Sequence, residues 1–492
     1  MRIFFLAFCC FPLLLFGQDF KNLNLNEPWE AGDSIPPFWE TLRLSTQLEL
    51  VQGPASSDAQ LILKDLGEPA GGYLFQKVSL DPDTFAEAEK ELIPYRLSAR
   101  IKVDVSDTTI VMLFANGIGD GEYLVTPRQN LSQTEDFEMV SLDMWLDNRI
   151  DELQIGLYMK GGGQAVVSDF RLTQVETTSE NANPQVLAFA DEIIDTIAEN
   201  SLFRDSLDIP SLRSRLYQMA SGISQTEDLN NAVGTILRLI DNHSFILSSE
   251  QVQAWQNQSG ASEDSTSGSP SPLPDLRGHM LDKRVAYIRM PGFSSGDSTQ
   301  LVHFADSLQR LIAELDKPDL AGWVLDLRGN TGGNCWPMLA GIGPILGDGT
   351  CGFFDDGENQ QAWSYDDGSS FAGENKVVSV SREPYIPFTP NPKVAVLIGP
   401  RTASSGEVTA IAFANRPNTV LLGNPTGGFT TGNRSFSLSN GSLLFLATSV
   451  YADRSGQLYP ERIFPNEEVF IYGDSMSSED LIEAARSWIV SD

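Results

Sequence analysis

The 492-residue sequence has few histidines and few basic side chains. It contains 3 histidines, and its 33 lysines and arginines are outnumbered by 66 aspartates and glutamates, which gives a formal net charge of −33. A surface of this charge repels nucleic acid and anionic membranes, so neither is expected as a partner. The acidity is most simply explained as a solubility feature.

Cysteine is also scarce. Of the 4 cysteines, Cys9 and Cys10 lie in an apolar run at the start of the chain, which leaves Cys335 and Cys351 elsewhere. In an oxidising compartment these two could form a disulfide, and two free buried thiols are the alternative.

The sequence lacks an apolar run long enough to cross a bilayer comfortably. The run from Ile3 to Phe16 follows Arg2 and precedes small or polar residues, which is the pattern of a secretory signal peptide. We therefore predict a signal peptide over residues 1–18, no membrane insertion, and an exported protein that is periplasmic or extracellular.

Residues 19–176 show the two-residue alternation of strands. Leu97, Ala99 and Ile101 would share one face of a strand, as would Leu153 and Ile155. This pattern predicts an antiparallel β-sandwich, whose first and last segments resemble those of galactose-binding-like jelly rolls. A spacer or docking role is favoured for this domain, and glycan contact is the alternative.

The remaining sequence indicates a multidomain chain, for which its length is sufficient. Residues 184–256 have apolar side chains at helical spacing, residues 257–275 are rich in Ser, Gly and Pro and predict a linker, and residues 276–492 alternate buried strands with amphipathic helices. The last region is therefore predicted to be an α/β domain.

Two adjacent serines, Ser404 and Ser405, stand between a predicted buried strand, "KVAVLIGP", and a predicted helix, "SGEVTAIAFANR". At the start of a helix, free backbone N–H groups and the helix dipole stabilise negative charge on a bound carbonyl oxygen. A helix-capping serine is the simpler interpretation of this turn by itself.

Companion motifs change that interpretation. They are "LIDNHS" at residues 239–244, "VLDLRGNTGG" at 324–333, "TASSGE" at 402–407, "LLGNPTGG" at 421–428 and "GQLYPERIFPNEEV" at 456–469. In this order they resemble the tail-specific or C-terminal processing serine peptidases. The resemblance covers the chain from about residue 184 onward and implies a crotonase-like (ClpP/crotonase) α/β peptidase core with a helical N-terminal subdomain.

The resemblance assigns roles around the serine pair. It implies that Ser404 is the nucleophile, with the backbone N–H of Ser405 as one donor to the oxyanion. Gly332 or Gly333 would supply the second donor, because a side chain there would block the approach of the substrate carbonyl. A tight turn is the structural alternative for these glycines.

The sequence departs from the usual lysine base of this family. Phe429 occupies the position that resembles the lysine-bearing turn, and Lys393 is the last lysine of the chain. The tricorn branch of the family uses a histidine instead, and His243 matches its position. By the same resemblance, Asn242 and Glu461 are the candidates to orient His243. The alternative for Asn242 is a residue that only ends the helix, and the alternative for Glu461 is an ordinary surface carboxylate.

These residues predict a serine-type endopeptidase or carboxyl-terminal processing peptidase that needs no metal and no organic cofactor. Only about forty residues separate His243 from the first predicted core strand at Val285, too few for a PDZ domain. We therefore expect short or unfolded peptides as substrates, admitted by a cleft with Phe293, Trp336 or Phe429 in its wall.

Two functions of other classes remain open. One is a non-catalytic ligand-binding or scaffold protein of the same fold, as in the retinoid-binding relatives of this family. The other is a carbohydrate-binding surface protein that acts through its β-sandwich. Failure to react with a serine-directed probe would favour the first, and binding of polysaccharide by residues 19–176 the second.

Overall fold

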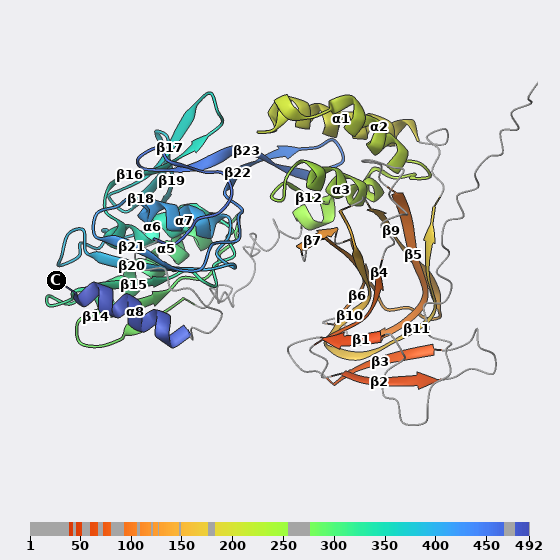
Figure 1. Ribbon diagram of the computed structural model, residues 1–492, viewed down its shortest axis with the longest axis horizontal. Helices are drawn as coiled ribbons and strands as arrows, with labels where there is room; N and C mark the ends of the chain where they lie inside the picture. The colour runs from red at the N-terminus through yellow and green to blue at the C-terminus, as the bar shows by residue number, and fades with distance from the viewer. Residues whose placement is uncertain are drawn as a thin grey trace, which may run out of the picture. The chain divides into compact units, whose positions relative to one another are not determined.

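The computed structural model (Figure 1) describes residues 39–42, 46–51, 60–66, 72–79, 93–105, 109–119, 122–125, 127–146, 149–175, 183–253, 276–466 and 478–491. The predicted signal peptide and the predicted linker lie outside these residues. The chain divides into two compact units, Met1–Ala190 with Pro210–Leu239, and Asp191–Ile209 with Ile240–Asp492.

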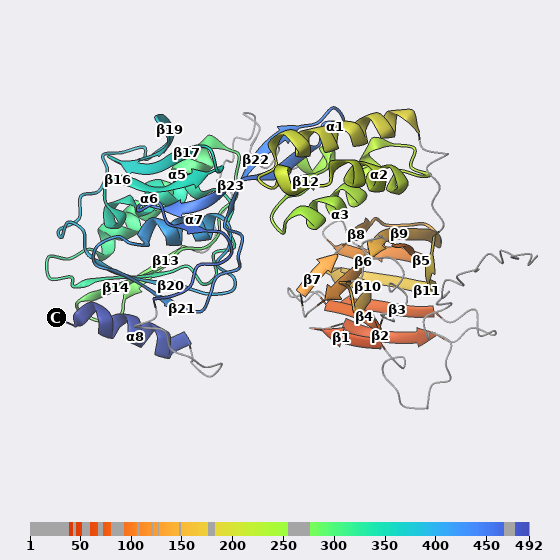
Figure 2. The ribbon, with the colours of Figure 1, turned by 45° about the horizontal axis from the view of Figure 1, so that its top comes forward.

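The first unit contains two antiparallel sheets (Figure 2). Their strands are β1 (Trp39–Leu42), β2 (Thr46–Val51), β3 (Gln60–Leu66), β4 (Gly72–Ser79), β5 (Ile93–Val105), β6 (Ile110–Gly119), β7 (Glu122–Val125), β8 (Arg128–Leu131), β9 (Glu138–Leu146), β10 (Glu152–Lys160) and β11 (Gly162–Gln174). One sheet has the order β1-β4-β10-β6-β7, with β8 paired to β6, and the other has the order β2-β3-β11-β5-β9.

Both sheets contribute to one hydrophobic core. Leu97 and Ile101 of β5 and Leu153 and Ile155 of β10 are at most 1% exposed and belong to the same cluster. Because β5 and β10 lie in different sheets, the two sheets pack face to face across this core. The predicted alternation along both strands is confirmed.

The helical region follows the sheets and is shared between the two units. It comprises α1 (Pro184–Asn200), α2 (Ile209–Met219) and α3 (Asn230–Ile240). The chain passes from one unit to the other within α1, after Ile209 at the start of α2, and after Leu239 near the end of α3. The sequence had predicted a single helical subdomain over residues 184–256.

A mostly parallel sheet forms the centre of the second unit. Its order is β13 (Arg277–Met280), β14 (Val285–Arg289), β15 (Gly322–Asp326), β20 (Lys393–Ile398) and β21 (Thr419–Gly423); only β13 is antiparallel to its neighbour. Strands β15 and β20 are almost wholly buried, as expected for strands covered on both faces.

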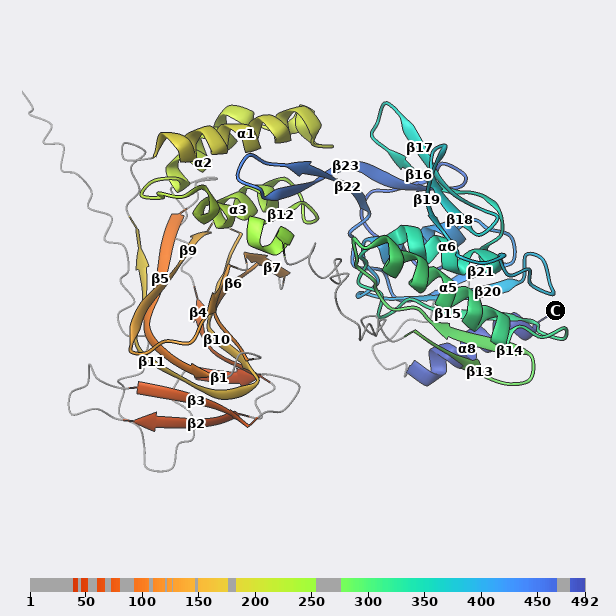
Figure 3. The same cartoon turned by 180° about the vertical axis from the view of Figure 1, so that it is seen from behind.

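Helices cover both faces of this sheet (Figure 3). Helices α5 (Ser298–Leu315), α6 (Cys335–Leu346) and α7 (Ser405–Phe413) share one core with it, while α8 (Ser478–Val490) packs on the opposite face. The alternation of β15 fits this arrangement, because Trp323 and Leu325 enter the first core and Val324 enters the second.

A second, antiparallel sheet of the same unit has the order β12-β23-β16-β17-β18-β19, with β22 and β24 also paired to β23. Its strands are β12 (Phe245–Leu247), β16 (Gly349–Asp355), β17 (Gln360–Asp366), β18 (Ser369–Ala372), β19 (Asn375–Ser379), β22 (Thr431–Ser437), β23 (Leu443–Asp453) and β24 (Leu458–Tyr459). The long β23 pairs with β12 at one end and with β16 at the other.

Cys335 and Cys351 are free and buried, which is the second of the two alternatives that the sequence left open. Burial raises the pKa of the Cys335 thiol to about 12 and that of Cys351 to about 11, so both are protonated at neutral pH. Within the described parts of the chain, the helices are all too short or too polar to cross a bilayer.

Two helical glycines test how closely α6 is packed. A Cβ on Gly343 would lie 1.9 Å from Cε2 of Tyr365, whose ring is only 3% exposed and cannot move aside. We expect Gly343→Ala to lower the free energy of unfolding by about 1–3 kcal/mol, measured by calorimetry.

Gly234 in α3 is the matched control, because a Cβ there would meet only Arg238, at 3.6 Å. Gly234→Ala is expected to stabilise the protein by about 0.5–1 kcal/mol, since alanine loses less conformational entropy in a helix. Equal stability of Gly343→Ala and the unmodified chain would contradict the close packing of α6.

Candidate active site

Ser404 lies in the turn between β20 and α7, at the carboxyl end of a parallel strand, where ligands bind in open α/β sheets. Its backbone has φ 52° and ψ −119°, a conformation that residues other than glycine rarely adopt. Such a conformation costs about 1–3 kcal/mol and persists only where the surroundings enforce it.

The loop after β15 braces this turn. The Thr402 hydroxyl donates to the Leu327 carbonyl at 2.9 Å, and the Ala403 N–H donates to the Asn330 carbonyl at 3.0 Å. A Cβ on Gly406 would lie 2.4 Å from that same Asn330 oxygen. Glycine is therefore required at position 406 for the two loops to approach so closely.

His243 reaches the site from the end of α3. The Asp241 carboxylate accepts hydrogen bonds from the N–H groups of His243 and Ser244, at 2.7 and 2.6 Å, and so fixes the turn that follows the helix. The Asn433 side chain on β22 donates to the His243 carbonyl at 2.8 Å. The backbone around the imidazole is thus held from both sides.

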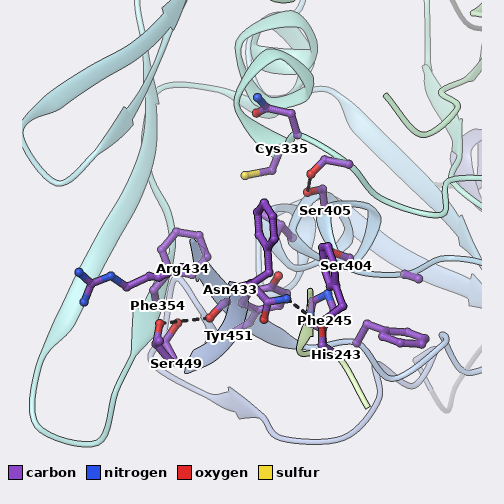
Figure 4. A pocket seen from close by; sticks show the side chains of 18 of the residues that line it. His243, Phe245, Cys335, Phe354, Ser404, Ser405, Asn433, Arg434, Ser449 and Tyr451 are labelled. Atoms are coloured by element: carbon purple, nitrogen blue, oxygen red, sulfur yellow. Dashed lines mark hydrogen bonds between the residues drawn. The ribbon is translucent and has the colours of Figure 1, made fainter. Parts of the chain in front are cut away.

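The His243 ring, which Figure 4 shows in the same pocket as Ser404, lies between two hydroxyl groups. Its Nε2 is 3.1 Å from Ser404 Oγ, and its Nδ1 is 2.8 Å from Thr431 Oγ1. The tautomer with hydrogen on Nδ1 lets the ring donate to Thr431 and accept the Ser404 proton, as a general base must. The Phe429 ring packs edge-on against the imidazole, with ring centroids 5.4 Å apart.

The pKa of His243 lies below its ordinary value. Burial is the main cause, because the imidazolium loses solvation, while the Asp241 charge and a hydrogen bond to the Thr431 backbone act in the opposite direction. The lowered pKa keeps the imidazole neutral at neutral pH, the form that can take up a proton.

Asn242 and Glu461, predicted to orient His243, are both exposed. Because Ser404 and Thr431 already occupy the two ring nitrogens, neither nitrogen is left for Asn242 or Glu461 in this structure. Sequence reasoning missed Thr431, since nothing in "GGFTTG" separates it from the preceding Thr430. Its position on β22 places it beside the ring.

The predicted oxyanion donors differ in their availability. The Gly332 N–H donates to Asn330 Oδ1 at 3.0 Å, and the Ser405 hydroxyl donates to the Gly333 carbonyl at 2.8 Å. Within the described residues, the N–H groups of Gly333 and Ser405 have no hydrogen-bond acceptor. Gly333 has φ 120°, and a Cβ there would clash with Phe293.

The pocket around Ser404 has a volume of about 1720 Å³. Trp336 and Phe429 line it, as predicted, together with Phe354 and Tyr451, which sequence reasoning missed. Phe293 is instead 5% exposed and stacks on Phe304 in the core, because its alternating position beyond β14 turns it inward. It does not line this pocket.

Aromatic side chains continue outward from the serine. The Phe354 ring centroid lies 5.7 Å from that of Tyr451 and 6.2 Å from that of Trp336. Tyr451 interacts electrostatically with Ser404, and burial raises the pKa of its phenol well above the ordinary value. One side of the pocket is therefore an uncharged aromatic wall. Among the residues described, acidic, histidine and cysteine side chains form no cluster suited to a metal ion.

The chain is similar in sequence to known peptidases and related proteins. Residues 284–469 match the sequence model of peptidase family S41. The nisin-resistance protein of Lactococcus lactis subsp. lactis is 32% identical over 180 residues, which are 36% of this chain and 54% of that protein. The carboxy-terminal processing protease CtpA of Bacillus subtilis (strain 168) is 26% identical over 186 residues, 38% of this chain and 35% of that protein.

One similar solved structure is that of a lipoprotein from Streptococcus agalactiae, with 25% identity and a TM-score of 0.49, covering 62% of this chain and 96% of that one. The match spans about half of the length of the nisin-resistance protein and about a third of the length of CtpA.

The environment of His243 predicts how the residue titrates. We expect an NMR titration to give a pKa below the ordinary histidine value of about 6.5. Because the unfolded chain then binds the proton more tightly, folding stability should fall as the pH drops from about 6.5 toward the folded pKa. Thr431→Val removes an acceptor for the imidazolium N–H and should lower the pKa of His243 further. A pKa above 6.5 in the folded chain would contradict this account.

Proposed function

We propose that the protein is a secreted serine-type endopeptidase or carboxyl-terminal processing peptidase of family S41, whose sequence model matches residues 284–469, with Ser404 as nucleophile and His243 as general base. The observation that carries this proposal is the 3.1 Å contact between His243 Nε2 and Ser404 Oγ at the start of α7. Neutral imidazole and serine hydroxyl at this distance form an activated nucleophile.

The chemistry is hydrolysis through an acyl-enzyme. Ser404 Oγ forms a bond to the carbonyl carbon while His243 Nε2 takes up the hydroxyl proton. When the tetrahedral intermediate collapses, the C–N bond breaks and Nε2 returns the proton to the leaving amine. Water then attacks the ester with His243 again as base, which releases the acid and restores the Ser404 hydroxyl.

The unpaired N–H groups of Gly333 and Ser405 are the proposed oxyanion donors, of which Gly333 is favoured over Gly332 because the Gly332 N–H is already bonded to Asn330. Thr431 takes the orienting role that had been predicted for Asn242 and Glu461. With hydrogen on Nδ1, the ring donates to the Thr431 hydroxyl and its unprotonated Nε2 faces the serine.

Further aspects of the proposal concern the whole chain. We propose that the protein is exported and that, without a PDZ domain, it acts on peptides or unfolded proteins. We also propose a crotonase-like core over residues 276–492, joined by a linker over 257–275 to a helical part over 184–256. Residues 19–176 are proposed to form a galactose-binding-like jelly roll. The face-to-face antiparallel sheets of the first unit are compatible with the jelly roll. A spacer or docking role is proposed for that domain.

A fluorophosphonate probe tests the nucleophile and the base. We expect a covalent adduct on Ser404, located by mass mapping, which is lost in Ser404→Ala and slowed by about 100-fold or more in His243→Ala, because the hydroxyl then has no base. His303→Ala is the matched control, since His303 lies on α5 and should leave labelling unchanged. An adduct that forms equally fast without His243 would show that the wrong base has been named.

The aromatic wall predicts the residue preferred on the acyl side of the cleaved bond. A charged side chain beside Phe354 and Tyr451 would lose solvation, and neither aromatic ring can pair with its charge. In peptides that differ only at this residue, we expect kcat/KM to be about 100-fold higher for Leu than for Asp. Phe354→Ala should reduce that ratio, and equal rates for Leu and Asp peptides would contradict the placement of the acyl side at this wall.

A further inference from the structure

We propose that Glu407 is a positioning residue, whose carboxylate holds Ser404 in its strained backbone conformation and ties it to the loop that packs against His243. The inference rests on the proposed function, because it assigns a purpose to the geometry of the proposed nucleophile. Among the described residues, the Glu407 carboxylate contacts neither the Ser404 hydroxyl nor the imidazole, and it acts through the backbone.

The Glu407 side chain is 0% exposed and accepts four hydrogen bonds. Its Oε2 accepts from the N–H groups of Ser404, at 2.8 Å, and Phe429, at 2.9 Å. Its Oε1 accepts from the Gly428 N–H at 2.9 Å and from the Thr426 hydroxyl at 2.5 Å. The carboxylate therefore joins the first turn of α7 to residues 426–429.

A carboxylate suits this place because all four partners are donors. An ionised carboxylate only accepts hydrogen bonds, whereas an amide of the same size presents an NH₂ group on one side. Burial raises the pKa of Glu407, and the hydrogen bonds from Thr426, Gly428, Ser404 and Phe429 oppose that rise. These donors are all uncharged, so the charge is stabilised by dipoles and not by a salt bridge.

One oxygen of this carboxylate serves both halves of the site. Oε2 binds the backbone of Ser404, whose φ of 52° needs an outside constraint, and the backbone of Phe429, whose ring packs edge-on against His243. Displacing this oxygen would free the Ser404 backbone to relax and would loosen the side chain beside the base. Both changes would alter the 3.1 Å contact between Ser404 and His243.

The first experiment separates positioning from general stability by comparing two buried carboxylates. Glu407→Gln is compared with Asp453→Asn, because Asp453 is also 0% exposed and accepts from uncharged donors, among them Asn415, Ser455 and Tyr459. Both variants should lose stability. We expect only Glu407→Gln to lower the maximal rate of fluorophosphonate labelling, by about 10–100-fold, with little change in the probe's half-saturating concentration.

The second experiment does not depend on activity. Ser404→Gly relieves the strain at positive φ, whereas Ser404→Ala keeps it and also lacks the hydroxyl. With Glu407 unchanged, we expect Ser404→Gly to melt about 2–4 °C above Ser404→Ala. In the Glu407→Gln background this difference should shrink by at least half, because residue 404 is then free to relax.

The outcomes are distinguishable. Equal maximal labelling rates for Glu407→Gln and Asp453→Asn, or the same glycine–alanine difference in both backgrounds, would overturn the role of Glu407. Absence of labelling in the unmodified protein would count against the proposed function, while the melting experiment would still decide the inference. If Glu407→Gln does not fold, Glu407→Asp replaces it with the same expectations, because the shorter carboxylate draws back from the Ser404 N–H.

Discussion

The antiparallel pairing of β12 with β23 is the constraint on which the site depends. Strand β12 has only three residues and begins two residues after His243, so its register on β23 fixes where the imidazole lies. The Ser244 hydroxyl accepts from the Ala447 N–H at 2.9 Å, and Asn433 on the neighbouring β22 binds the His243 carbonyl. A residue 161 positions from Ser404 thereby comes within hydrogen-bond distance of it.

Backbone geometry on the serine side is just as closely determined. Loops that follow β15 and β20 meet at the carboxyl ends of these strands, where Asn330 is 0% exposed and binds both Ala403 and Gly332. A buried carboxylate with uncharged partners, Glu407, joins the turn at Ser404 to residues 426–429. Such networks are costly unless every donor is matched, so they specify one arrangement of the loops.

The electrostatics of the site differ from those of the surface. The chain carries a formal net charge of −33, yet Phe354 and Tyr451 bring uncharged aromatic rings to the pocket, and burial lowers the pKa of His243, the proposed base. A histidine base suits a segment that has no lysine after Lys393. The net charge is therefore a property of the whole chain, whereas the pKa of His243 depends on its local burial.

The sequence by itself determined most element types and identified Ser404 and His243 as candidate site residues, because strand alternation, helical spacing and ordered motifs are local properties of the chain. It also indicated the glycines after β15. Only the tertiary structure decided that Thr431 faces Nδ1, that Phe293 turns into the core and that the two cysteines stay apart. Those outcomes depend on sheet register and on contacts between distant segments, which no local pattern encodes.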